Sequence, residues 1–155
     1  YIVGTPAELP FAVRQTREML PGMPILSYAG IESQEFLNAA GPAAEGIIYT
    51  TTAYDPSSDD ENVKAFVAAY SALYKDVPTS PYAGYGYDAV MVADAALKKS
   101  GGETGQKLRD AIYDIRVFPG VTGENSFRDD GTVAKSVAIR KVEGGKFTTI
   151  DIVEP

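Results

Sequence analysis

The order of elements along the chain predicts an α/β fold built on a parallel sheet. Within the first 52 residues, three short apolar runs typical of strands alternate with two stretches of helical periodicity. Strands and helices that alternate at this spacing indicate βαβ units, in which the strands run parallel. The 155 residues suffice for one domain or two small lobes, and an apolar content of 45% is ordinary for a globular protein.

The first predicted strand covers residues 1–4, and a helix follows it. Thr5 and Glu8 have the spacing of a capping box. Pro10 conflicts with a helix that starts at Thr5, because proline removes an early backbone donor. The helix therefore begins either at Thr5 or only at Pro10, and the Pro-Gly pair at 21–22 ends it.

Two more strands are predicted at 24–28 and 46–52, with a short helix over 33–40 that Ser33 caps. The acidic run 59–61 suits the N-terminus of a further helix. Its apolar stripe consists of Val63, Phe66, Val67, Tyr70 and Tyr74. We expect Tyr49, Tyr70 and Tyr74 to lie in the core.

The second half begins with a predicted loop over 78–86. The helix over 87–99 is apolar nearly all round, which predicts burial between layers. Another helix is expected over 104–115, and the remaining residues are predicted to be β. They comprise a strand over 121–127, a turn at 129–131 and two strands around the Gly pair at 144–145.

Composition excludes several classes of function. The chain has no Cys and no His, which excludes a zinc finger, a thiol nucleophile, a disulfide framework and any histidine-based triad. The net charge is −7 and the basic residues never cluster beyond pairs, so no nucleic-acid partner is expected. No apolar run reaches the roughly 18 residues of a membrane span.

Two motifs resemble functional signatures but fail in detail. Asp55, Ser57 and Asp59 could open a calcium loop, yet Asp60 and Phe66 stand where that loop needs Gly and Glu. Helix capping explains the run better. No carboxylate pair has a spacing that suggests acid–base chemistry, so we expect no metal site and no catalytic residue.

The run Gly84-x-Gly86-x-x-Ala89 matches a loose dinucleotide fingerprint. Prolines occupy the stretch where a strand should precede it, and tyrosines inside the motif obstruct a pyrophosphate. We therefore expect a loop that enters a helix, and no cofactor. A flavodoxin-like enzyme is an alternative class of function, and it would need such a phosphate-binding loop.

Tyrosine is the more informative residue type, with ten Tyr against six Phe and no Trp. A tyrosine offers a flat apolar face and a hydroxyl, which suits a binding cleft. Tyr28 ends a predicted parallel strand, and Thr5 follows the first strand. Parallel sheets bind ligands beyond the carboxyl ends of their strands. Tyr28 either lines such a cleft or packs under a helix.

The ordered series of motifs resembles a known family. The series comprises residues 1–17 with the run RQTR, AAEG at 43–46, YDP at 54–56 with VKAFV at 63–67, GYDA at 86–89, and FPGVTG at 118–123 with Phe127 and Gly131. Across essentially all 155 residues, the chain resembles the C-terminal half of the periplasmic substrate-binding proteins of Leu/Ile/Val-type ABC importers.

The resemblance implies a type I periplasmic-binding-protein fold, incomplete here, with flavodoxin-like parallel-sheet lobes joined by a hinge. Residues 1–52 would belong to the second lobe, 53–134 to the first, and 135–155 would return to the second. It further implies a small-molecule ligand held between the lobes, a membrane permease as partner and a periplasmic or lipid-anchored extracellular location. A partial fold leaves a sheet edge or lobe face uncovered, which predicts self-association.

The family's ligand-contact positions fall on five residues of this sequence. The loop after the first strand falls on Thr5, and the loop after the second falls on Ala29 beside Tyr28. The aromatic position before the long helix falls on Tyr82, with Tyr85 close by.

Ala29 stands where amino-acid binders of the family carry an acid for the ligand ammonium. A buried ammonium without a counter-charge costs several kcal/mol. Unless Glu8 or Glu32 substitutes, we expect an uncharged, aromatic or carboxylate ligand. The alternative function is the extracellular ligand-sensing domain of a receptor. The ending at 153–155 resembles a natural terminus, which favours the importer.

Overall fold

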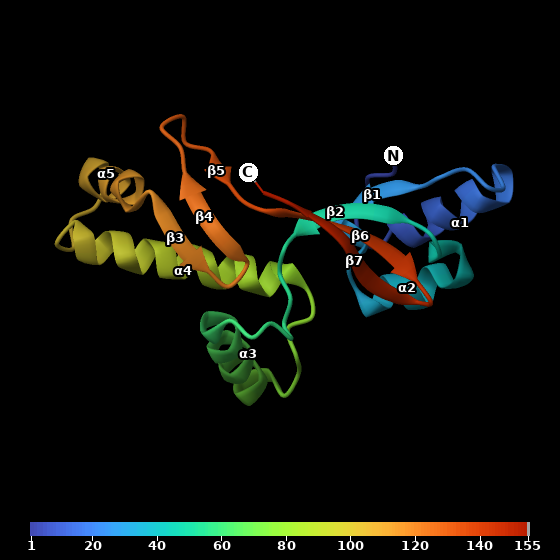
Figure 1. Cartoon of the computed structure of the whole chain (residues 1–155), viewed down its shortest axis with the longest axis horizontal. Coiled ribbons are helices and arrows are strands. Elements are labelled where there is room, and N and C mark those ends of the chain that lie inside the picture. Colours follow the sequence, from blue (N-terminus) through green and yellow to red (C-terminus); the bar gives the residue numbers. More distant parts are fainter. Residues whose placement is uncertain (155) are drawn as a thin grey trace. The chain divides into compact units, whose positions relative to one another are not determined.

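The computed structural model describes residues 1–154. The chain divides into two compact units, which we call unit 1 (Tyr1–Thr52 with Val137–Val153) and unit 2 (Ala53–Ser136 with Glu154). Unit 1 is therefore made from both ends of the sequence, and unit 2 is inserted between them (Figure 1).

Unit 1 contains a four-stranded sheet in the order β1-β2-β6-β7. Its strands are β1 (Leu26–Tyr28), β2 (Ile48–Thr52), β6 (Val137–Glu143) and β7 (Lys146–Val153). Only β1 and β2 run parallel, whereas β6 pairs antiparallel with both β2 and β7. The parallel arrangement predicted for the βαβ part is confirmed for β1 and β2, and the two strands predicted around the Gly pair at 144–145 are confirmed as β6 and β7.

Residues 1–4 do not form the predicted strand. The segment bonds to β1 through the Ile2 amide, which donates to the Leu26 carbonyl at 2.8 Å, and through the Ser27 hydroxyl, which donates to the Ile2 carbonyl at 3.0 Å. Two such bonds align the segment beside β1 without establishing a strand ladder.

The helices of unit 1 are α1 (Leu9–Met19) and α2 (Gln34–Ala40), with 3₁₀ turns η1 (Ala29–Ile31) and η2 (Gly41–Ala44). Helix α1 begins between the two predicted starts. The Glu8 carboxylate accepts hydrogen bonds from the amide and the hydroxyl of Thr5, so the capping-box bonds form in a turn before the helix. Ser33 caps α2 as predicted, accepting from the Phe36 amide at 3.1 Å.

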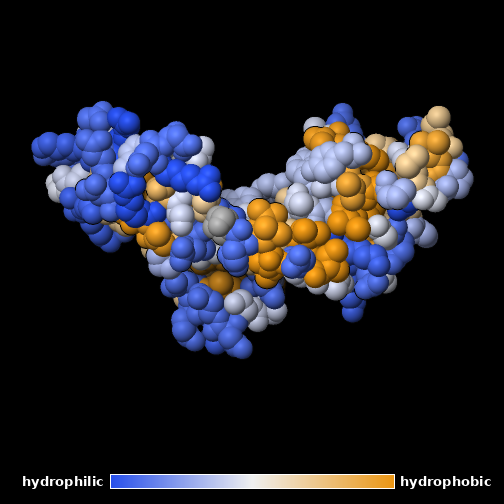
Figure 2. Space-filling model, turned by 45° about the horizontal axis from the view of Figure 1, so that its top comes forward, coloured by the Kyte–Doolittle hydropathy of each residue, from blue (hydrophilic) through white to orange (hydrophobic). Residues whose placement is uncertain are grey.

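One face of this sheet packs on α1 and α2. The buried cluster there contains Leu9, Val13, Ile25, Ile31, Phe36, Leu37, Ala40, Ala44, Ile47, Tyr49 and Val142. Burial of Tyr49 confirms its assignment to the core. Exposed apolar side chains also gather over the strands of unit 1 (Figure 2), and they include Leu26, Val137, Ile150, Ile152 and Val153. No element among residues 1–154 buries these side chains.

Unit 2 contains three helices and a small antiparallel sheet. The helices are α3 (Glu61–Tyr74), α4 (Pro81–Lys99) and α5 (Gln106–Ile115). The strands are β3 (Val117–Gly120), β4 (Gly123–Phe127) and β5 (Val133–Ala134), in that spatial order. Asp60 caps α3 by accepting from the amides of Asn62 and Val63, as the acidic run indicates.

Helix α4 corrects two predictions. It begins at Pro81, because the Ser80 hydroxyl accepts from the Tyr82 amide and proline suits the first helical position. Tyr82 and Tyr85 are therefore helical rather than in a loop. The helix is also not buried all round, since Val90 is 67% exposed and only Pro81, Gly84, Asp88 and Ala96 are buried.

The core of unit 2 is a small cluster of Tyr54, Val63, Phe66 and Val121, with Val67, Tyr70 and Ala83 packed against it. Tyr74 was expected in the core but is 62% exposed, because it lies on the last turn of α3, where its ring stacks only on Tyr70. Within residues 1–154, no helix combines the length and apolar character needed to cross a membrane.

Tyr54 gives the core of unit 2 a pH dependence. Its buried hydroxyl donates to the Pro78 carbonyl at 2.7 Å, and burial, followed by the charge of Asp55, raises its pKa to about 12. The unfolded phenol titrates near 10. The native state thus keeps a proton that the unfolded state loses, so this stabilisation is complete below pH 10 and disappears as pH rises through 12.

We expect the free energy of unfolding to fall by about 2 kcal/mol more in the parent protein than in Tyr54→Phe between pH 9 and 12. Urea midpoints at each pH measure this difference. Tyr74→Phe, an exposed matched control, should follow the parent curve. Identical pH dependence of the parent and Tyr54→Phe would contradict the assignment.

Candidate functional site

Three of the five predicted contact residues lie together at one edge of the unit 1 sheet. Tyr28 is the last residue of β1, and Ala29 follows it as the first residue of η1. The Tyr28 hydroxyl donates to the carbonyl of Gly4 at 2.7 Å, which places Thr5 at the same edge. This is the carboxyl end of the parallel pair, the edge at which α/β sheets bind ligands.

Tyr28 has a structural role at this edge, because it packs against the unit 1 core and its hydroxyl proton is used by Gly4. Its ring lies so close to Gly30 that a Cβ there would come within 2.4 Å of the Tyr28 Cζ. The absence of a Cβ at Gly30 therefore makes space for the Tyr28 ring. Tyr28 thus packs against the unit 1 core and Gly30, and ligand contact by its remaining ring surface stays a prediction.

Polar groups of Thr5 and Ala29 at the same edge are engaged in local hydrogen bonds. The Thr5 hydroxyl donates to Glu8 at 2.8 Å. The Ala29 carbonyl accepts from the Glu32 amide at 3.0 Å, which closes the turn of η1. The edge thus offers aromatic and small apolar surface and no exposed charge from these three residues.

Tyr82 and Tyr85 lie in unit 2, on the first turns of α4. Their rings meet edge to face with centroids 5.7 Å apart, and Tyr82 is 52% exposed. The ammonium of Lys135 lies 5.7 Å from the centre of the Tyr85 ring. The two tyrosines therefore form an aromatic pair at the start of α4, and the Lys135 ammonium lies beside it.

A buried carboxylate that sequence reasoning did not pair fixes this end of α4. Asp88 accepts from the amides of Val121 and Thr122 at 2.7 and 3.0 Å and from the Thr122 hydroxyl at 2.5 Å. Lys135 donates to the Thr122 hydroxyl and lies 4.0 Å from Asp88. Burial lowers the pKa of Lys135, although Asp88 opposes the shift. The network ties α4 to the β3–β4 turn.

A second buried ion pair lies in unit 1. Arg140 on β6 donates through Nη1 to Glu32, and their side chains are only 13% and 3% exposed. Arg140 also donates through Nε to Thr149 at 3.1 Å. Burial, reinforced by the charge of Glu32 and opposed by Arg140, raises the pKa of the neighbouring Tyr49 far above its usual value.

Three polar atoms in this region are buried without a hydrogen-bond partner among residues 1–154, namely Glu32 Oε2, Tyr49 Oη and Thr51 Oγ1. Sequence alternation could have indicated that Arg140 points inward, because it stands between the inward-facing Ala138 and Val142 of β6. Glu32 gave no such signal, since it follows a 3₁₀ turn.

The polar side chains buried near the predicted contact residues are engaged in contacts within each unit. Among the described residues, no group of three or more acidic side chains is arranged to hold a metal ion. The carboxylates of Asp88 and Glu32 are occupied by backbone amides and by Arg140 respectively. What the two units display is aromatic surface, at a sheet edge in one and at a helix start in the other.

Such a two-unit α/β chain, with aromatic surface at the carboxyl end of a parallel strand pair, has the features of a ligand-binding module. The sequence matches the family described as periplasmic binding protein over residues 1–146. The chain therefore belongs to the periplasmic binding protein family, which is a family of substrate-binding proteins rather than of enzymes.

Relatives of known structure or curated sequence agree with this assignment. The chain is 28% identical to the leucine-binding protein LivK of Thermotoga maritima (TM-score 0.85, 98% of this chain and 43% of that one). It is also 28% identical to LivJ of Streptococcus pneumoniae, solved with isoleucine (TM-score 0.80, again 98% and 43%). A Leu/Ile/Val-binding protein homologue of Brucella suis is 29% identical over 84% of this chain and 34% of its own length. The chain thus spans less than half of these relatives.

The Glu32–Arg140 pair makes a testable contribution to stability. Arg140→Met leaves the Glu32 carboxylate buried without its cation, and we expect a loss of about 3–5 kcal/mol in the free energy of unfolding. The double variant Glu32→Leu/Arg140→Met removes both charges and should recover most of that loss. Urea denaturation measures both.

Lys141→Met is the matched control, because Lys141 is the next residue on β6 and pairs with the exposed Glu143. It should cost less than about 0.5 kcal/mol. If Arg140→Met were no more destabilising than Lys141→Met, the buried pair would not have the role described.

Proposed function

We propose that this chain is the C-terminal part of an extracytoplasmic solute-binding protein that delivers a small organic solute to an ABC importer. The family match over residues 1–146 carries the proposal, and the names of the relatives support it. In this proposal unit 1 belongs to the second lobe and unit 2 to the first, with residues 53–134 inserted between the two parts of the second lobe.

The two lobes would close about a hinge on the bound ligand. The pairing of Thr52 with Val137 supports this, because the chain leaves unit 1 after one of these residues and re-enters at the other. Both connections therefore start from the same point of one sheet. Few residues would need to change their backbone angles during closure.

The ligand would contact Thr5, Tyr28 and Ala29 from one lobe and Tyr82 and Tyr85 from the other. We infer that it carries no α-ammonium group. Ala29 has no charge, Glu8 is exposed and occupied by Thr5, and the negative charge of Glu32 is balanced by Arg140. An uncharged, aromatic or carboxylate solute fits these positions better than leucine, isoleucine or valine.

The complete protein would deliver its ligand to a membrane permease and would lie in the periplasm or at the outer surface, held there by a lipid anchor. The exposed apolar residues of the unit 1 sheet support the view that further parts of the protein, or a second copy of this chain, cover it.

A thermal-shift screen of the complete gene product tests the proposal. Aromatic carboxylates and neutral solutes, each supplied at about 100 times its Kd, should raise Tm by roughly 5–10 °C. Tyr82→Ala should abolish that shift, whereas Tyr74→Ala, exposed on α3, should preserve it. Stabilisation by branched-chain amino acids alone would overturn the inferred ligand class, and stabilisation by no solute would overturn the function.

A further inference from the structure

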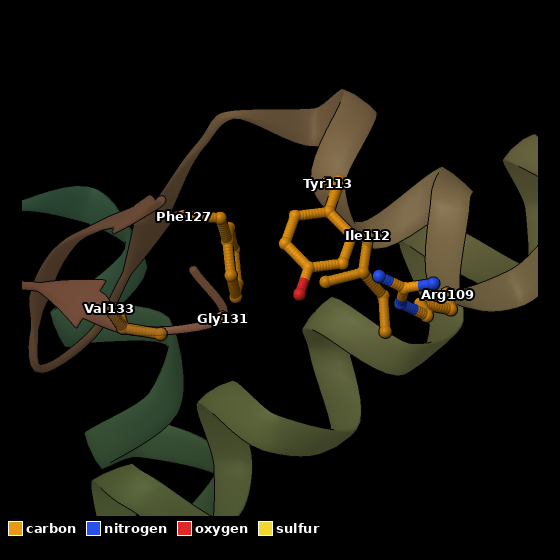
Figure 3. A pocket seen from close by; sticks show the side chains of 6 residues that line it. All are labelled: Arg109, Ile112, Tyr113, Phe127, Gly131 and Val133. Carbon is orange, nitrogen blue, oxygen red and sulfur yellow. The ribbon is translucent and has the colours of Figure 1, made fainter. Parts of the chain in front are cut away.

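Unit 2 contains a groove that the proposed function does not use. It has a volume of about 290 Å³ and lies between α5 and the strands β4 and β5 (Figure 3). The lining residues are Arg109, Ile112, Tyr113, Phe127, Gly131 and Val133. All of them belong to unit 2, so the groove is complete within one compact unit.

The walls of the groove are apolar and aromatic. The rings of Tyr113 and Phe127 lie on opposite sides of the hollow with their planes inclined to each other, and Ile112 and Val133 also line it (Figure 3). Gly131 has φ +87°, and a Cβ there would lie 3.2 Å from the Tyr113 hydroxyl, so the glycine keeps the space beside that hydroxyl open. Two aromatic rings on opposite sides of such a hollow favour a slender apolar group, which can contact one ring by its face and the other by its edge.

A cation at the rim supplies the polar part of the site. The guanidinium of Arg109 lies 5.2 Å from the centre of the Tyr113 ring. Within residues 1–154 it forms neither an ion pair nor a hydrogen bond, and it is exposed. A guanidinium held over a ring keeps its N–H donors available for a carboxylate.

The acids nearest to Arg109 have partners of their own. Asp129 pairs with Arg116 at 2.6 Å, Asp114 lies 3.9 Å from Lys99, and Asp110 accepts from Gln106 at 2.8 Å. These three aspartates line an adjoining hollow together with Arg109 and Tyr113. Their presence disfavours a ligand with a second negative charge.

From this geometry we propose that the groove is a second ligand site, which binds a small apolar monocarboxylate. The apolar body lies between Tyr113 and Phe127, and the carboxylate pairs with Arg109. The volume is at the lower end of the range for organic ligands. The groove shares no residue with the predicted contact residues of the proposed cleft, so this proposal does not depend on the proposed transport function.

Titration of the isotope-labelled 155-residue chain with hydrocinnamate, followed by amide NMR, tests this site. We expect shifts confined to α5, β4 and β5 and a Kd on the order of 1 mM. Arg109→Met should raise Kd at least about tenfold. Arg128→Met removes the same charge from outside the groove lining and should change Kd by less than about twofold.

Two further comparisons establish which part of the ligand is recognised. Hydrocinnamyl alcohol, phenylpropylamine and phenylsuccinate should each bind more weakly than hydrocinnamate. Val133→Phe, at a 43% exposed position, should fill the groove and abolish binding while the amide signals of Val121 and Thr122 stay in place. Equal binding by the amine, unchanged affinity in Arg109→Met, or shifts centred outside the groove would overturn the proposal.

Discussion

The antiparallel pairing of β2 with β6 is the constraint on which the rest of the structure depends. It joins residues 48–52 to residues 137–141, so everything between them must leave the unit 1 sheet and return to it. Residues 53–136 of unit 2 are consequently an insertion rather than a tail, and both ends of this insertion adjoin the Thr52–Val137 pair.

Two buried carboxylates are stabilised in different ways, and each fixes one unit internally. Glu32 is balanced by Arg140, which anchors the turn after β1 to the returning strand β6. Asp88 is satisfied mainly by amides of the β3–β4 turn. Close packing surrounds Asp88, since a Cβ at Gly120 would come within 2.4 Å of its carboxylate and a Cβ at Gly84 within 2.5 Å of the Thr122 methyl. Asp88 of the GYDA motif and Gly120 of the FPGVTG motif therefore have packing roles.

Local signals predicted much of this fold. The cap residues Ser33 and Asp60 begin their helices as expected, because a side-chain acceptor beside free amides acts within a few residues. Ser80 offers the same signal, but residues 78–86 were predicted to be a loop, and the start of α4 was placed six residues too late.

Long-range features could not be predicted in the same way. The apolar composition of α4 predicted burial. Burial depends on the elements that pack against a helix, and residues 1–154 pack against only part of the surface of α4. The Glu32–Arg140 pair joins residues 108 apart in sequence, and no local pattern encodes such a pairing. The position of Tyr28 at the sheet edge could be predicted, because the residue ends a strand. The hydrogen bond from its hydroxyl to the Gly4 carbonyl depends on tertiary packing and could not be predicted.

The central claim is that this chain contributes to a cleft for a solute without an α-ammonium group. Mass spectrometry of the small molecule released when the purified complete gene product is denatured tests this claim most directly. The account predicts one equivalent of an aromatic, carboxylate or uncharged solute per protein. Release of leucine, isoleucine or valine in that amount would contradict it.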